Sequence, residues 1–116
     1  MTNQTNPYVA HPELFAPLIA VGQKAQSWLE PSLAELVKLR ASQINGCAPC
    51  IVLHSKEARA KGETEERIYL LNAWRESDLY TPRERAALAW TEALTRISER
   101  HPTSEVDAMV EEQFTY

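Results

Sequence analysis

Two cysteines three residues apart, Cys47 and Cys50, are the side chains of this sequence best suited to chemistry. His54 follows Cys50 by four residues, which places the two on one face of a helix. Asn45 and Gly46 predict the end of one helix, and Pro49 predicts the start of the next, so both sulfurs lie at a helix N-terminus. Free backbone N–H groups and the helix dipole stabilise a thiolate there, so we expect a lowered thiol pKa.

The histidine indicates which sulfur attacks. An imidazole one turn further along the helix can accept the proton of Cys50, which makes Cys50 the attacking thiolate and Cys47 its resolving partner. Thioredoxin-like proteins attack with the first cysteine and need a βαβ context, which this sequence does not predict. A disulfide closing a two-residue loop constrains the unfolded chain little, so we expect a reactive or metal-binding pair and not a structural staple.

Glu35 is the fourth candidate site residue. It precedes Gly46 by eleven residues and His54 follows Gly46 by eight, so antiparallel helices would bring the two side chains to similar heights. The carboxylate could then accept a hydrogen bond from the far nitrogen of His54 and fix its tautomer. Because Glu35 lies outside the main apolar stripe, the alternative is a carboxylate on a solvent-exposed helix face.

Other interpretations of these residues stay open. The cysteines could be two small buried apolar side chains, and His54 could be a hydrogen-bonded core histidine. A structural zinc site needs four ligands, whereas Cys47, Cys50 and His54 supply three, and His11 and His101 are distant in sequence. We therefore predict a site with no metal and no cofactor.

Apolar residues at helical spacing, punctuated by proline and glycine, predict an all-α fold. Thr81 and Glu84 have the spacing of a capping box, and no segment alternates as a strand does. We expect a flexible N-terminal arm over residues 1–11 and one helical domain over 12–116, whose uncapped last helix is compatible with truncation at the C-terminus. The predicted helices, about six, span residues 12–29, 31–44, 48–61, 65–73, 83–99 and 104–114.

Composition excludes several functions. A net charge of −4 with scattered basic residues argues against nucleic-acid binding. There is no apolar run of membrane-spanning length and no secretory signal at the N-terminus, so we expect a cytoplasmic protein that does not contact a membrane. Arg40 lies within an apolar stripe, and a charge there needs a partner, such as a carboxylate on another helix.

The segment from Glu35 to Arg59 resembles the alkylhydroperoxidase D-like (AhpD-like) core of the carboxymuconolactone decarboxylase family. The shared pattern is a glutamate, eleven residues, Cys-x-x-Cys, three residues and a histidine. A weaker likeness extends through residues 70–74 and 81–90, so that about two thirds of the chain is covered.

This resemblance implies an AhpD-like helical bundle that assembles into homotrimers or homohexamers. It implies hydroperoxide reduction in which Cys50 attacks, Cys47 resolves to a disulfide, and Glu35 and His54 form a proton relay. Well-studied members carry another relay histidine where this chain has Pro49, which leaves the relay incomplete. The decarboxylase branch lacks the cysteine pair, so the chain does not resemble a lactone decarboxylase.

The leading hypothesis is a thiol-dependent, alkyl hydroperoxide reductase-like antioxidant enzyme. Its expected partners are a small hydroperoxide and an external dithiol or disulfide reductant. One alternative is a general thiol–disulfide oxidoreductase without peroxidase activity, which Pro49 favours. Another is a non-enzymatic helical oligomer that binds a small ligand or a metal.

Overall fold

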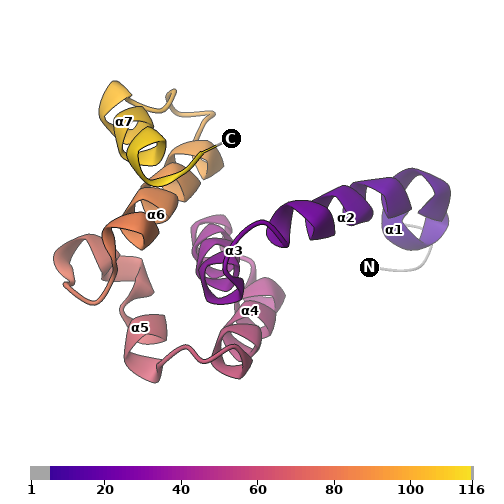
Figure 1. Cartoon of the computed structure of the whole chain (residues 1–116). Helices are drawn as coiled ribbons and strands as arrows, with labels where there is room; N and C mark the ends of the chain where they lie inside the picture. The colour runs from indigo at the N-terminus through magenta and orange to yellow at the C-terminus, as the bar shows by residue number, and fades with distance from the viewer. Residues whose placement is uncertain (1–5, 116) are drawn as a thin grey trace. The chain divides into compact units, whose positions relative to one another are not determined.

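The computed structural model describes residues 6–115, and every regular element in that range is helical. Six α-helices of at least five residues alternate with short turns, and two further short helical segments accompany them (Figure 1). The elements are α1 (Pro7–Ala10), α2 (Pro12–Gln26), α3 (Pro31–Asn45), α4 (Ala48–Ala60), α5 (Glu65–Tyr69), the 3₁₀ helix η1 (Leu71–Glu76), α6 (Pro82–Thr95) and α7 (Ser104–Gln113).

The predicted all-α fold is confirmed, with two additions. The helix predicted over residues 65–73 is instead α5, which ends at Tyr69, followed after Leu70 by η1. Ala73, inside η1, kinks that 3₁₀ helix with a non-helical backbone at φ −118° and ψ 28°. The turn α1 falls within the predicted N-terminal arm, and the Asn6 side chain caps it by accepting a hydrogen bond from the Tyr8 N–H. Residues 1–5 of that arm lie outside the described residues.

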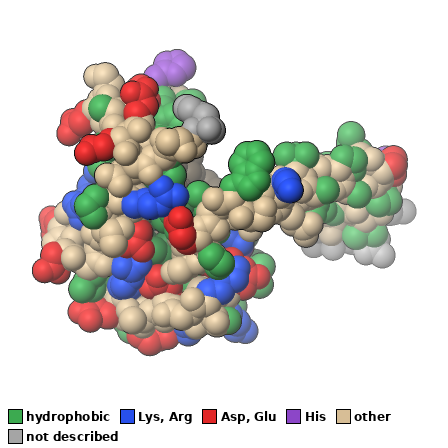
Figure 2. All heavy atoms as spheres, in the orientation of Figure 1, with side chains coloured by type: hydrophobic (Ala, Val, Ile, Leu, Met, Phe, Trp, Pro, Cys, Tyr) green, Lys and Arg blue, Asp and Glu red, His purple; other side chains and the backbone are tan. Residues whose placement is uncertain are grey.

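The chain divides into two compact units, residues 1–31 and 32–116. Neither α1 nor α2, in the first unit, has a buried residue. Large apolar side chains are therefore exposed along these helices (Figure 2). On α2 and just beyond it they are Leu14, Leu18, Ile19, Val21 and Trp28.

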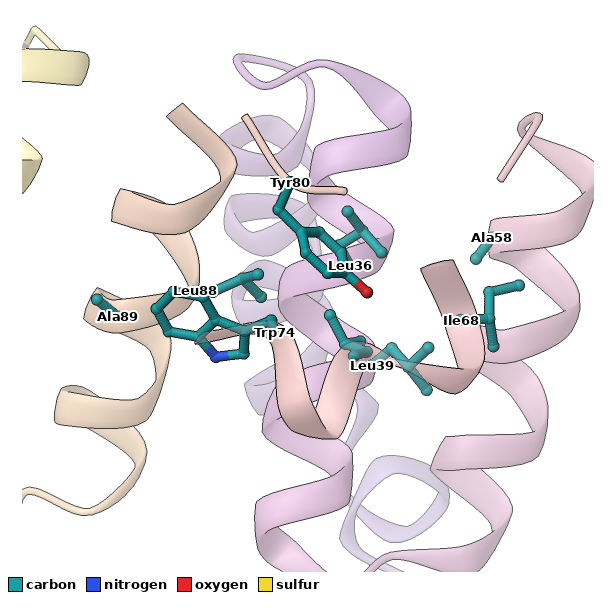
Figure 3. Packing of buried hydrophobic residues seen from close by; sticks show 9 residues of the cluster. Leu36, Leu39, Ala58, Ile68, Trp74, Tyr80, Leu88 and Ala89 are labelled. Atoms are coloured by element: carbon teal, nitrogen blue, oxygen red, sulfur yellow. The ribbon is translucent and has the colours of Figure 1, made fainter. Parts of the chain in front are cut away.

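The second unit contains the hydrophobic core. Side chains from α3 through α6 converge there, so that α3 and α4 both contribute to one buried cluster (Figure 3). Each fully buried leucine contributes about 1.5–3 kcal/mol relative to an exposed one. The core members are Leu36, Leu39, Ala58, Ile68, Leu71, Trp74, Tyr80, Leu88 and Ala89.

Local signals set the ends of these helices. Gly46 adopts φ +65°, a left-handed conformation that suits glycine, and so lets α3 end and α4 begin two residues later. Thr81 accepts a hydrogen bond from the Glu84 N–H while the Glu84 carboxylate accepts one from the Thr81 N–H, which confirms the predicted capping box of α6.

Arg40 pairs with a carboxylate, as expected for a charged side chain within an apolar stripe. Its guanidinium lies 3.3 Å from the Glu92 carboxylate of α6 and donates hydrogen bonds to the side chains of Asn72, at 2.9 Å, and Gln43, at 3.1 Å. The expected carboxylate on another helix is therefore present. Between residues 6 and 115, no helix combines the length and apolarity that crossing a bilayer requires.

Candidate functional site

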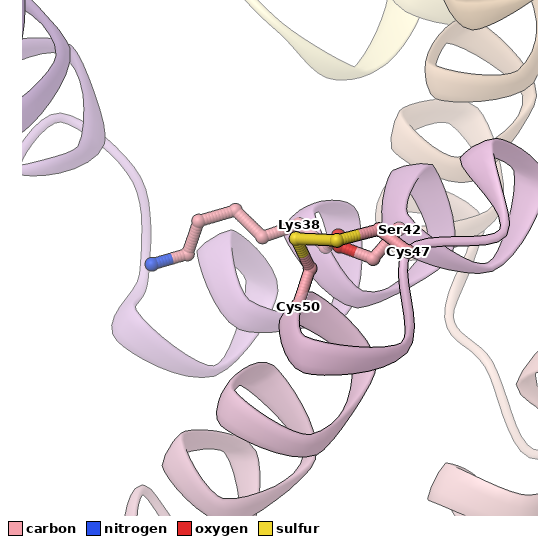
Figure 4. Close-up of a disulfide and its surroundings, with 4 residues drawn as sticks. All are labelled: Lys38, Ser42, Cys47 and Cys50. Atoms are coloured by element: carbon pink, nitrogen blue, oxygen red, sulfur yellow. A yellow bond between two sulfur atoms is a disulfide. The ribbon is translucent and has the colours of Figure 1, made fainter. Parts of the chain in front are cut away.

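The cysteine pair lies at the turn from α3 to α4. Cys47 is the N-cap of α4, where its N–H donates to the Ser42 carbonyl and its own carbonyl accepts from the Ile51 N–H. Cys50 lies in the first turn of the helix, and a disulfide joins the two residues with their Cα atoms 5.3 Å apart (Figure 4). Both are partly exposed, so reagents in solution can reach the pair.

His54 follows the disulfide by one turn of α4 and faces two carboxylates. Its Nδ1 atom lies 3.3 Å from Oε2 of Glu57, on the same helix, and 3.5 Å from Oε2 of Glu35, on α3. The structure thus brings Glu35 to His54, and Cys47 to Cys50. The catalytic roles assigned to these four residues remain predictions.

Glu35 is fully buried, so the alternative of a solvent-exposed carboxylate is wrong. Its Oε1 atom lies 2.7 Å from the Lys38 ammonium of α3 and accepts a 2.7 Å hydrogen bond from Lys61, the C-cap of α4. Both ammonium groups are partly exposed, while the carboxylate between them is not. Two cations on one oxygen fix the orientation of this carboxylate.

The lysines keep Glu35 ionised. Burial by itself raises the pKa of a carboxyl group, but the hydrogen bonds from Lys38 and Lys61 outweigh it and lower the pKa of Glu35 to about 2. The same hydrogen bond raises the pKa of Lys61. The other oxygen of Glu35, Oε2, is buried and has no hydrogen-bond partner among the described residues, although it faces His54.

Three members of this cluster were not predicted from the sequence: Lys38, Glu57 and Lys61. Helical spacing offered a signal for two of them, since Lys38 follows Glu35, and Glu57 follows His54, by three residues. The contact of Lys61 with Glu35 spans 26 residues and depends on how α3 packs against α4, which spacing within one helix does not report.

Three of these side chains could offer ligands to a divalent metal ion. One atom each from Glu35, His54 and Glu57 lies within 4.8 Å of the others. However, the ammonium groups of Lys38 and Lys61 already contact Glu35 and would repel a cation. The arrangement therefore suits handling of protons better than binding of a metal ion.

Comparison with known families gives one match that covers most of the chain. Residues 12–93 match the model of the carboxymuconolactone decarboxylase family. This range contains the disulfide, His54 and all four charged residues around it.

Known proteins that are similar to the chain include one from Bacillus subtilis and one from Agrobacterium tumefaciens. The uncharacterized protein YdfG of Bacillus subtilis (strain 168) is 46% identical over 89 residues, which are 77% of this chain and 60% of YdfG. A crystal structure of a protein of unknown function from Agrobacterium tumefaciens, proposed to be the antioxidant defence protein AhpD, is 41% identical with a TM-score of 0.85. That likeness covers 95% of this chain and 76% of the Agrobacterium chain.

Proposed function

The chain belongs to the carboxymuconolactone decarboxylase family, and we propose that it is an AhpD-like, thiol-dependent alkyl hydroperoxide reductase. The observation that carries the proposal is the Cys47–Cys50 pair at the N-terminus of α4, one turn before His54. A thiolate at a helix N-terminus is stabilised by the helix dipole, and an imidazole one turn away can accept its proton.

The proposed reaction begins with the reduced pair. The Cys50 thiolate attacks one peroxide oxygen, so that an S–O bond forms, the O–O bond breaks and the alkoxide leaves with a proton from His54. Cys47 then attacks the sulfur of the sulfenic acid; the disulfide forms and water leaves. An external dithiol reduces the disulfide by thiol–disulfide exchange and is itself oxidised to a disulfide.

The test measures loss of tert-butyl hydroperoxide with dithiothreitol as reductant. We expect Cys50→Ser to lower turnover by about 100-fold or more, because the nucleophile is gone. Without dithiothreitol, reduced Cys47→Ser should consume about one equivalent of peroxide per subunit and then stop as a sulfenic acid. Ala48→Ser, which adds a hydroxyl to the same turn, is the matched control and should keep wild-type turnover. A Cys50→Ser protein with wild-type turnover contradicts the proposal.

Pro49 favours a second candidate, a thiol–disulfide oxidoreductase that does not reduce peroxides. Proline holds no proton and so cannot replace the relay histidine that the resemblance implies between the two cysteines. Rates of the reduced protein with tert-butyl hydroperoxide and with oxidised glutathione separate the candidates. A fast reaction with the disulfide and none with the peroxide favours the oxidoreductase.

We also propose that the chain self-associates, as a homotrimer or homohexamer. The exposed apolar side chains on α2 support this, because a monomer rarely leaves so many large apolar residues of one helix in water. Sedimentation velocity measures the mass of the assembly directly.

A further inference from the structure

Two carboxylates face the same nitrogen of His54, but their surroundings differ. Glu35 is fully buried and takes two lysine contacts on Oε1. The side chain of Glu57 is 39% exposed, and the nearest ammonium, that of Lys38, lies 3.7 Å from its Oε2. Glu57 is also nearer to His54 Nδ1, at 3.3 Å against 3.5 Å for Glu35.

The surroundings of Glu35 prevent it from carrying protons. Protonating it would leave the ammonium groups of Lys38 and Lys61 without the charge that both contact, which is costly in a partly buried site. With a pKa of about 2, Glu35 remains an anion throughout the pH range in which thiols react. It can therefore orient the imidazole but cannot accept its proton.

The surroundings of Glu57 allow proton transfer. The titratable groups facing it are Glu35 and Lys38 from α3, and His54 and Lys61 from its own helix and cap. Glu57 lacks the two close ammonium contacts that hold Glu35 as an anion, so Glu57 is the carboxylate that can take a proton from His54. Because Glu57 is partly exposed, it can release that proton to water.

Building on the proposed function, we propose that Glu57 exchanges protons between His54 and solvent, while Glu35 serves only as a fixed anion that positions the imidazole. Before attack, the Cys50 proton passes to one ring nitrogen of His54, and Nδ1 gives its proton to Oε2 of Glu57 and so to water. This leaves the thiolate. After the O–O bond breaks, the alkoxide takes a proton from His54, which is resupplied from water by the reverse path.

Kinetics of Glu57 variants test this proposal. Glu57→Gln should lower kcat about tenfold in dilute buffer with KM for tert-butyl hydroperoxide unchanged, because water replaces the carboxylate only poorly as a proton carrier. Acetate added to the buffer should restore the rate, and Glu57→Asp should keep most of it. Glu66→Gln, an exposed glutamate of α5, is the control and should match wild type. A wild-type kcat in Glu57→Gln, or a loss that acetate does not restore, overturns the proposal.

A second measurement needs no peroxide, and so separates this proposal from the proposed function. The chain has three histidines, His11, His54 and His101, so NMR can resolve the ring N–H of His54. In the reduced protein, we expect Glu57→Gln to slow exchange of this N–H with water about tenfold, as removal of a proton-transfer group should. Unchanged exchange means that Glu57 does not carry this proton, and faster exchange means that Glu57 only shields the ring. Either result overturns the role of Glu57 even if peroxide turnover is found.

Discussion

Replacing Glu35 with glutamine removes the one buried charge that both lysines contact. The pKa of Glu35 falls from 4.5 to about 2 on folding, and each pKa unit is worth about 1.4 kcal/mol, so ionisation of Glu35 contributes about 3 kcal/mol to stability near neutral pH. Lys61 is 42% exposed, and water screens part of its attraction to Glu35. We therefore expect Glu35→Gln to lower the free energy of unfolding at pH 7 by about 2–3 kcal/mol.

The pH dependence identifies the cause. Because folding lowers the pKa of Glu35, its contribution is fully present above pH 4.5 and is lost as the pH falls toward 2. Urea unfolding of both oxidised proteins, followed by circular dichroism, should show a stability difference that is less than half as large at pH 3 as at pH 7. Glu63 and Glu84, whose pKa values are also lowered, titrate in both proteins and cancel in the difference.

Glu66→Gln provides the matched control, since it removes an exposed carboxylate of the same type and should leave stability unchanged within about 0.5 kcal/mol. Two results refute this account of the cluster. One is a Glu35→Gln protein as stable as wild type at pH 7. The other is a stability difference that does not change between pH 7 and pH 3.

Two further substitutions test the framework of the site by urea unfolding. Arg40→Leu should lower the free energy of unfolding by about 3 kcal/mol, because Glu92 then loses a buried partner. The control, Arg100→Leu on the exposed surface, should change it little. Equal effects of the two substitutions contradict the structural role assigned to Arg40. Gly46→Ala should lower the free energy of unfolding by about 1 kcal/mol, because an alanine backbone is strained at φ +65°, although no atom would crowd its Cβ. Gly22→Ala, within α2, should raise helicity instead, and a neutral Gly46→Ala would show that this turn is not strained.

The fold could largely be predicted from the sequence because its signals are local. Apolar spacing, the Thr81 capping box and Gly46 each act within one or two turns of backbone, so they predict where helices begin and end. The change from α5 to η1 after Tyr69 could not be predicted, because no proline or glycine marks it. The family pattern and the place of the disulfide at a helix start were also readable, since both depend on spacing along one stretch of chain.

Tertiary structure decided the electrostatics of the site. The sequence indicated that Arg40 needs a partner, but Glu92 lies 52 residues away, and only the packing of α3 against α6 identifies it. In the same way, Glu35 becomes a fixed anion because the packing of α3 and α4 brings Lys61 to the oxygen that Lys38 already contacts. Charges separated by tens of residues interact according to distance and burial in space, and the packed core sets both.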